Sequence, residues 1–89
     1  MNLTTSPDVL AAHLSGEAVL LNLKDKSYYR LNETAAAVWA GFERGETREK
    51  ILEALLSQYA VAADEALADV NRVIDDMKSR NLLIEPVET

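Results

Sequence analysis

Few side chains in this sequence are of the types that perform acid–base or nucleophilic catalysis. The chain has one histidine, His13, and no cysteine. No acid cluster or serine–base pair accompanies His13, and no serine has the sequence context of a nucleophile elbow. We therefore interpret His13 as a structural histidine at the surface or half-buried, and we expect that the chain is not an enzyme.

Metal and phosphate binding also lack the residues that they require. Asp75 and Asp76 are adjacent, so on a helix their side chains point about a quarter-turn apart and do not converge on one ion. The absence of cysteine excludes disulfide bonds and thiolate zinc sites. The glycines are isolated from one another, so none belongs to a phosphate-cradling loop. We expect neither a metal ion nor another cofactor.

Oppositely charged residues recur at helical spacing along residues 64–80. Asp69 precedes Arg72 by three positions, and Asp76 precedes Arg80 by four. Each such pair stabilises a helix by only about 0.2–0.5 kcal/mol. A salt-bridged helix face that is exposed to solvent is therefore the simpler interpretation of this pattern.

Two adjacent tyrosines give the one indication of binding that the residues themselves supply. Tyr28 and Tyr29 are neighbours in a predicted strand, so their side chains lie on opposite faces of the sheet. One packs inward, and the other remains on the outer face. If the strand order follows the chain order, this strand is at an edge, where unpaired N–H and C=O groups invite an added peptide strand. Many domains merely shield such edges, so the pattern alone does not distinguish a peptide-binding edge from a shielded one.

Length, composition and charge exclude several classes of protein. The 89 residues, of which 48% are apolar, predict one folded domain over residues 1–89 with a core of about residues 9–84. The net charge of -6 opposes binding to nucleic acid. The apolar stretches are far shorter than a membrane span of about 20 residues, and residues 1–8 lack the features of a signal peptide. We expect a cytoplasmic protein with no membrane partner.

The first third of the chain predicts a three-stranded antiparallel meander. Its strands are residues 9–13, 18–23 and 28–31. Gly16 indicates the first turn, and residues 24–27 have the length of a hairpin loop. One face of the second strand, at a spacing of two, carries Val19, Leu21 and Leu23.

The rest of the chain predicts three helices. Asn32 and Thr47 are N-cap candidates for the first two, and the third begins near Asp64. Asn81 is suited to the left-handed conformation that ends a helix, and residues 82–84 follow as a short strand or apolar tail. Gly41 and Gly45 bracket the end of the first helix. The expected apolar stripes are Ala35, Val38, Trp39 and Phe42; Ile51, Leu52, Leu55, Leu56 and Tyr59; and Leu67, Val70, Val73, Ile74 and Met77. The expected fold is a winged-helix-like α+β domain, with an N-terminal three-stranded antiparallel sheet followed by three helices.

Residues 20–39 resemble the PqqD-like family, whose members are also called RiPP recognition elements after the ribosomally made, post-translationally modified peptides that they serve. The shared pattern is an aliphatic strand, a short turn, an aromatic strand, then Leu31-Asn32 and a small-residue helix that contains Trp39. The resemblance continues through residues 47–59, which are similar to the family's second helix. It ends with Asp69-Val70 and, further along, Leu82-Leu83-Ile84. It covers roughly residues 18–84, and its specificity comes from the ordered combination.

The resemblance implies a function and a site. Family members bind the leader segment of a precursor peptide as a strand beside their third strand and against their third helix. The corresponding peptide-binding residues are Tyr28, Tyr29, Arg30, Leu31, Asp69, Val70, Arg72, Val73, Asp76 and Met77. We expect Arg30 or Arg72 to pair with an acidic leader residue, and Asp69 or Asp76 with a basic one.

Within the family, the chain is most similar to the stand-alone recognition proteins of lasso-peptide clusters, because residues 1–14 are shorter and less patterned than the N-terminal stretch usual in PqqD. The expected partners are the precursor peptide and a separate leader peptidase or other modifying enzyme, with the chain a monomer or weak dimer. One alternative is a PqqD-type peptide chaperone for a radical-SAM enzyme. Another is a winged-helix DNA-binding regulator, although residues 64–80 carry five acidic side chains against three basic ones.

Overall fold

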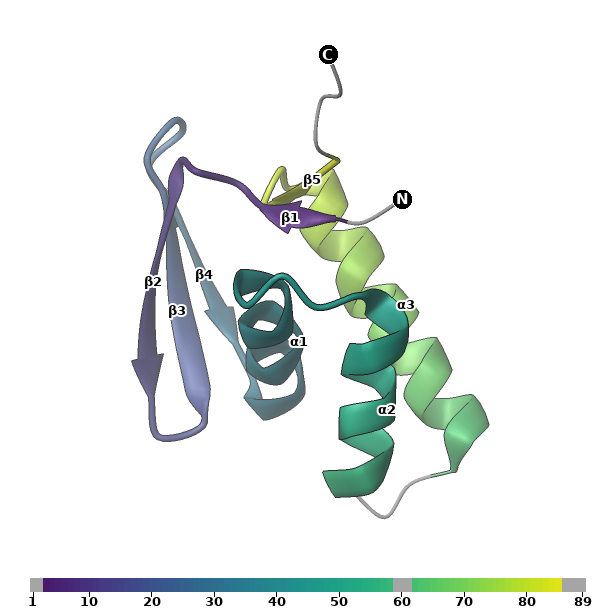
Figure 1. Cartoon of the computed structure of the whole chain (residues 1–89). Helices are drawn as coiled ribbons and strands as arrows, with labels where there is room; N and C mark the ends of the chain where they lie inside the picture. Colours follow the sequence, from purple (N-terminus) through teal and green to yellow (C-terminus); the bar gives the residue numbers. More distant parts are fainter. Residues whose placement is uncertain (1–2, 59–61, 86–89) are drawn as a thin grey trace.

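The structure is a computed structural model of the chain and describes residues 3–58 and 62–85. Three antiparallel strands form a sheet, and three helices follow it in the chain (Figure 1). The arrangement confirms the expected α+β fold. Two short strands, one at each end of the described chain, were not expected as a pair. The elements in order are β1 (Thr4–Thr5), β2 (Val9–Leu14), β3 (Glu17–Asn22), β4 (Ser27–Leu31), α1 (Glu33–Glu43), α2 (Arg48–Gln58), α3 (Ala63–Ser79) and β5 (Leu83–Ile84).

The register of the sheet decides which side chains are buried. On β3, Ala18 and Leu20 face the helices and are fully buried. They lie opposite Leu31 and Tyr29 of β4, which pack on the same side. α1 lies against this inner face, and α2 and α3 pack on α1 (Figure 1).

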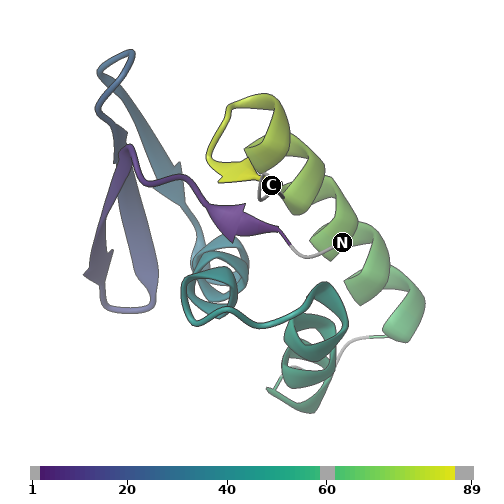
Figure 2. The ribbon, with the colours of Figure 1, turned by 45° about the horizontal axis from the view of Figure 1, so that its top comes forward.

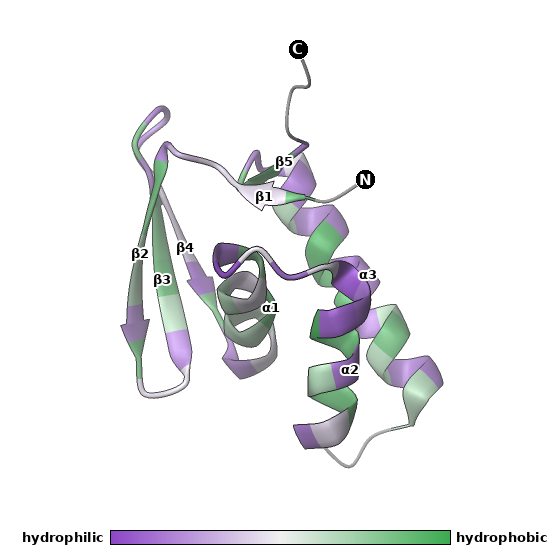
Figure 3. Cartoon of the chain, viewed as in Figure 1, coloured by the Kyte–Doolittle hydropathy of each residue, from purple (hydrophilic) through white to green (hydrophobic). Residues whose placement is uncertain are grey.

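The outer face of the sheet also carries apolar side chains, among them the exposed Leu10, Leu14 and Tyr28. Apolar residues occupy much of β2 and β3 (Figure 3). Leu10 pairs with Leu21, which pairs in turn with Tyr28, so these three side chains form a row across the strands. Val19 and Leu21 share a face as expected, but that face is the outer one. The strands carry leucines on both sides, so a spacing of two does not show which side is buried.

The turns and helix ends follow the local signals. Ser15 and Gly16 both have positive φ, which is the geometry of a two-residue hairpin turn whose twist suits the flanking strands. The Asn32 side chain accepts a hydrogen bond from the Ala35 amide at 2.9 Å, which confirms it as the cap of α1. Asn81 has φ 59° and follows Arg80, the residue that caps the C-terminal end of α3, as expected.

The second helix also begins where the sequence indicates. The Thr47 hydroxyl accepts a hydrogen bond from the Lys50 amide at 3.2 Å. α1 ends between Gly41 and Gly45, and only Gly45 has positive φ. Gly41 serves packing instead: a β-carbon there would lie 2.5 Å from Cγ1 of Ile51. Its lack of a side chain therefore lets α2 approach α1 closely.

The core joins the sheet to all three helices. The buried side chains of α3 are Ala66, Val70, Ile74 and Met77, and Val73 is half-buried. Leu67, expected in this stripe, is 44% exposed because the buried stripe passes through Ala66 instead. The largest fully buried side chains are Trp39, Leu20, Ile74, Met77, Leu82, Val38 and Val70. Tyr59, which was expected to continue the stripe of α2, lies outside the described residues.

The segment before β2 leaves the sheet and pairs with β5 at the C-terminal end of α3 (Figure 2). Thr4 pairs with Ile84 and Thr5 with Leu83. The Ser6 amide then donates to the carbonyl of Leu82 at 2.9 Å. The two ends of the described chain therefore hold each other in place.

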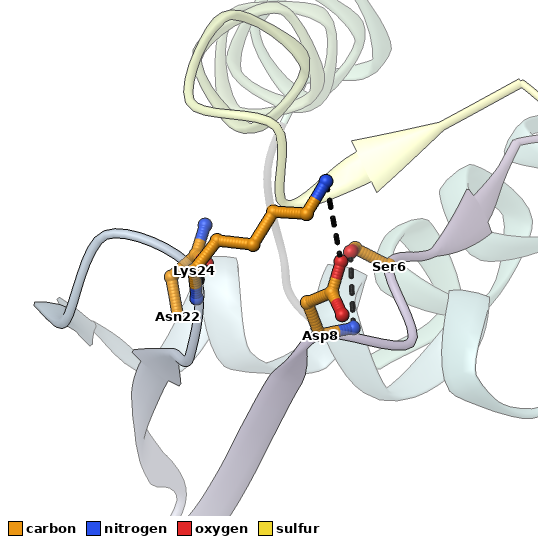
Figure 4. Close-up of polar contacts among 4 residues, drawn as sticks. All are labelled: Ser6, Asp8, Asn22 and Lys24. Carbon is orange, nitrogen blue, oxygen red and sulfur yellow. Dashed lines mark hydrogen bonds and ion pairs between the residues drawn. The ribbon is translucent and has the colours of Figure 1, made fainter.

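The same segment is tied to the loop between β3 and β4 (Figure 4). The Ser6 hydroxyl accepts a hydrogen bond from the Asp8 amide at 3.2 Å, and the Asp8 carboxylate lies 3.8 Å from the Lys24 ammonium. The buried Asn22 side chain accepts a hydrogen bond from the Lys24 amide at 2.9 Å. These contacts fix the loop from which β4 emerges, and so they help to position β4. No helix in the described part of the chain is long and apolar enough to cross a membrane.

Candidate functional site

β4 is an edge strand. The strand order is β2-β3-β4, so β4 pairs with β3 along one side, and no strand within residues 3–58 and 62–85 pairs with its other side. This confirms the expectation from chain order. The N–H and C=O groups along such an edge are available for an added strand.

A groove of about 370 Å³ lies between β4 and the C-terminal half of α3. The start of α1 and Leu82 complete its lining. Leu31, Met77 and Leu82 are buried and supply apolar surface at its base. The lining residues are Tyr28, Tyr29, Arg30, Leu31, Asn32, Ala35, Val73, Asp76, Met77, Arg80 and Leu82.

The two tyrosines differ as expected from their positions in the strand. Tyr28 is 71% exposed on the outer face, whereas Tyr29 packs against the core. Both line the groove. β4 therefore presents an aromatic ring on each side of the position that an added strand would occupy.

Arg80, at the C-terminal end of α3, contacts both Asp76 of the same helix and Tyr29 of β4. Nε of Arg80 donates a hydrogen bond to Oδ1 of Asp76 at 3.0 Å. The guanidinium carbon lies 5.0 Å from the centre of the Tyr29 ring, which is cation–π distance. The hydrogen bond to Asp76 is the main reason why the pKa of Arg80 is raised above its ordinary value. The guanidinium therefore stays charged at any physiological pH.

Most of the residues predicted for the site line this groove: Tyr28, Tyr29, Arg30, Leu31, Val73, Asp76 and Met77. Three do not. Val70 is fully buried in the core. Asp69 and Arg72 form an ion pair with each other on the exposed surface of α3 and do not line the groove. Only the C-terminal half of α3 faces β4, and this orientation is not encoded in the local sequence pattern.

Sequence reasoning missed four lining residues: Asn32, Ala35, Arg80 and Leu82. Arg80 carried a signal, because it lies one helical turn after Asp76 and Met77 and so continues the face that they form. Asn32 also caps α1. The lining residue Ala35 is buried against the core.

The groove lining carries both signs of charge. Its charged lining residues are Arg30, Arg80 and Asp76, two cations and one anion, for a net charge of +1. The whole chain carries -6. Arg30 also lies 3.4 Å from the Glu17 carboxylate across the outer face.

His13 lies at the other end of the sheet from the β3–β4 loop, on β2. Its Nε2 is 3.0 Å from Oε1 of Glu43 of α1, and both side chains are exposed. In the described part of the chain, no group of three or more His, Cys, Asp or Glu side chains is placed to hold a metal ion.

Fold and groove together define a small α+β domain whose free strand edge faces a helix. The chain belongs to the PqqD family, described as coenzyme PQQ synthesis protein D, whose sequence profile matches residues 17–83. This confirms the resemblance found in the sequence. A comparison with curated proteins gave no match.

Two solved structures share the whole fold. The structure of TbiB1 in complex with the TbiA(beta) leader peptide is similar over 96% of this chain and 99% of that chain, with a TM-score of 0.88 and 26% identity. A lasso peptide synthetase B1 complexed with the leader peptide is similar over 96% of this chain and 100% of that chain, with a TM-score of 0.85 and 22% identity. The second likeness, at its lower identity, concerns the fold alone.

Proposed function

We propose that the chain binds the leader segment of a ribosomally synthesised precursor peptide by β-strand addition along β4, in lasso-peptide biosynthesis. The observation that carries this proposal is the groove between the unpaired edge of β4 and α3. It occurs in a fold that matches TbiB1, a protein solved with a leader peptide bound, over 96% of this chain.

Strand addition gives the groove a simple mode of recognition. Main-chain hydrogen bonds to β4 hold the leader and set its register, whatever its sequence. Alternate leader side chains then point toward the groove, because successive residues of a strand face opposite sides. The apolar base formed by Leu31, Met77 and Leu82 favours an apolar leader side chain at that position.

The binding residues in this proposal are those that line the groove. Tyr28, Tyr29, Arg30 and Leu31 form the strand against which the leader lies, and α3 contributes Val73, Asp76 and Met77. We no longer assign a leader contact to Val70, which is enclosed by the core, or to the surface pair of Asp69 and Arg72.

We further propose that the chain supplies binding and a separate enzyme supplies the chemistry, either a leader peptidase or another modifying enzyme. Holding the leader raises the effective concentration of the precursor at the partner's active site. A second candidate is favoured by the description of the family, coenzyme PQQ synthesis protein D. In that role the chain presents its peptide to a radical-SAM enzyme.

Fluorescence polarisation tests the proposal. Labelled TbiA(beta) leader, a leader from a pyrroloquinoline-quinone precursor and a scrambled control peptide are each titrated with the folded protein. Saturable low-micromolar or tighter binding of the TbiA(beta) leader alone supports the lasso role. Preference for the pyrroloquinoline-quinone leader supports the second candidate. Equal affinity for the scrambled peptide, or no binding by a protein with native circular dichroism, contradicts both.

A further inference from the structure

We propose that Arg80 makes the groove selective for a leader that carries an acidic side chain opposite the C-terminal end of α3. This inference rests on the proposed function and adds a chemical preference to it. Sequence reasoning assigned the pairing with an acidic leader residue to Arg30 or Arg72 and gave Arg80 no part in the site.

The first support is the way in which Arg80 is held. Its Nε donates to Asp76 and its guanidinium lies above the ring of Tyr29, so the side chain is fixed from two directions. The Asp76 bond occupies Nε, and the terminal nitrogens retain N–H donors for a further acceptor. A guanidinium presents these donors as a planar fork that matches a carboxylate. Arg80 is therefore oriented before any ligand arrives.

The second support is the balance of charge in the groove. Asp76 is already hydrogen-bonded to Arg80, so it is a poor partner for a basic leader residue. A lysine placed beside Arg80 would meet a like charge, whereas a glutamate or aspartate would meet an opposite charge. The preference for an acid is thus a property of the lining, although the chain as a whole is acidic.

Arg72 supplies a matched comparison within the same helix. It forms an ion pair with Asp69, three residues earlier, much as Arg80 does with Asp76, four residues earlier. Both arginine side chains are exposed, at 76% for Arg72 and 47% for Arg80. Only Arg80 lines the groove. A difference in leader binding between variants at the two positions therefore reflects contact with the groove and not the overall charge of α3.

The test uses the TbiA(beta) leader peptide and two sets of its variants, which carry a single Glu or a single Lys at each successive position. Each peptide is titrated by fluorescence polarisation with wild-type protein, Arg80→Glu, Arg80→Gln and Arg72→Glu. Circular dichroism checks that each variant is folded. Arg80→Gln keeps a polar side chain of similar shape, so the test stands even if the charge reversal fails to fold.

For the wild type we expect one position at which Glu binds more tightly than Lys, by about three- to tenfold, as for a half-exposed ion pair. The preference disappears in Arg80→Gln, reverses in Arg80→Glu and persists in Arg72→Glu. It also shrinks as salt is added, because salt screens exposed charges.

One contrary result is that Arg80→Glu binds the leader and shows the same preference between the Glu and Lys peptides as the wild type at every position. That result overturns the role of Arg80 and leaves the proposed function intact. A loss of preference in Arg72→Glu equal to that in Arg80→Gln also overturns it. Failure of the wild type to bind any peptide in the panel removes the proposed function and this inference together.

Discussion

Tyr29 and Arg80 meet across the groove, with the guanidinium carbon of Arg80 5.0 Å from the centre of the Tyr29 ring. One residue lies in β4 and the other follows the last residue of α3. Their contact connects the two walls of the groove. Asp76 completes the arrangement by accepting a hydrogen bond from the same guanidinium.

Removing the Tyr29 ring should affect both stability and binding. Tyr29→Ala loses a half-buried aromatic side chain and the surface beneath Arg80, so the free energy of unfolding should fall by about 1–3 kcal/mol, less than for a fully buried ring. Leader affinity should fall as well. Tyr29→Phe keeps the ring and should retain most of both. Urea unfolding and leader titration measure the two effects, and an alanine variant that binds as tightly as Tyr29→Phe would contradict this role.

A charged side chain at Val73 should obstruct the groove. Val73→Lys extends a long cation from the wall formed by α3, and we expect leader affinity to fall by at least about tenfold, equivalent to about 1.4 kcal/mol. Leu67→Lys is the matched control, because Leu67 is an exposed apolar residue of the same helix outside the groove. It should bind as the wild type does. Equal loss of leader affinity in both variants would mean that an added cation anywhere on α3 weakens binding, and it would contradict a specific role for the groove.

Asn32 should matter for the stability of α1, whose start borders the groove. Asn32→Ala removes the acceptor for the Ala35 amide, and we expect a loss of about 1 kcal/mol in the free energy of unfolding. Asn32→Asp retains a capping oxygen and should be near wild type. Urea denaturation of the three proteins checks the order, and an alanine variant as stable as the aspartate variant would exclude the capping role.

Gly41 should tolerate no side chain. Alanine is favoured over glycine by about 1 kcal/mol within a helix, but its β-carbon would lie 2.5 Å from Cγ1 and 2.8 Å from Cδ1 of Ile51. Overpacking of this kind costs about 1–3 kcal/mol. We expect Gly41→Ala to lower the midpoint of thermal unfolding, and the double variant with Ile51→Ala to lose less than the sum of the single changes. A Gly41→Ala protein more stable than wild type would show that α2 moves aside freely.

Features with a local cause were predictable from the sequence. The strands of the meander, the caps at Asn32 and Thr47 and the left-handed Asn81 each depend on a few neighbouring residues. The pairing of β1 with β5 was not predicted, because two-residue strands at opposite ends of the described chain carry no periodic pattern.

The lining of the groove could be predicted from the sequence on β4 but only in part on α3. The residues of β4 lie in the groove because the strand has a free edge, which follows from chain order. On α3, the sequence offers two similar Asp–Arg pairs, one at Asp69–Arg72 and one at Asp76–Arg80. Which pair faces β4 depends on the tilt and rotation of the helix on the core, and those are set by packing rather than by local spacing.

Amide hydrogen exchange with and without the TbiA(beta) leader, read along the two edge strands, tests strand addition most directly. New main-chain hydrogen bonds should slow exchange in β4, at residues 27–31, while β2, at residues 9–14, exchanges as before. Slower exchange at β2, or unchanged exchange at β4 under saturating leader, would contradict binding along the β4 edge.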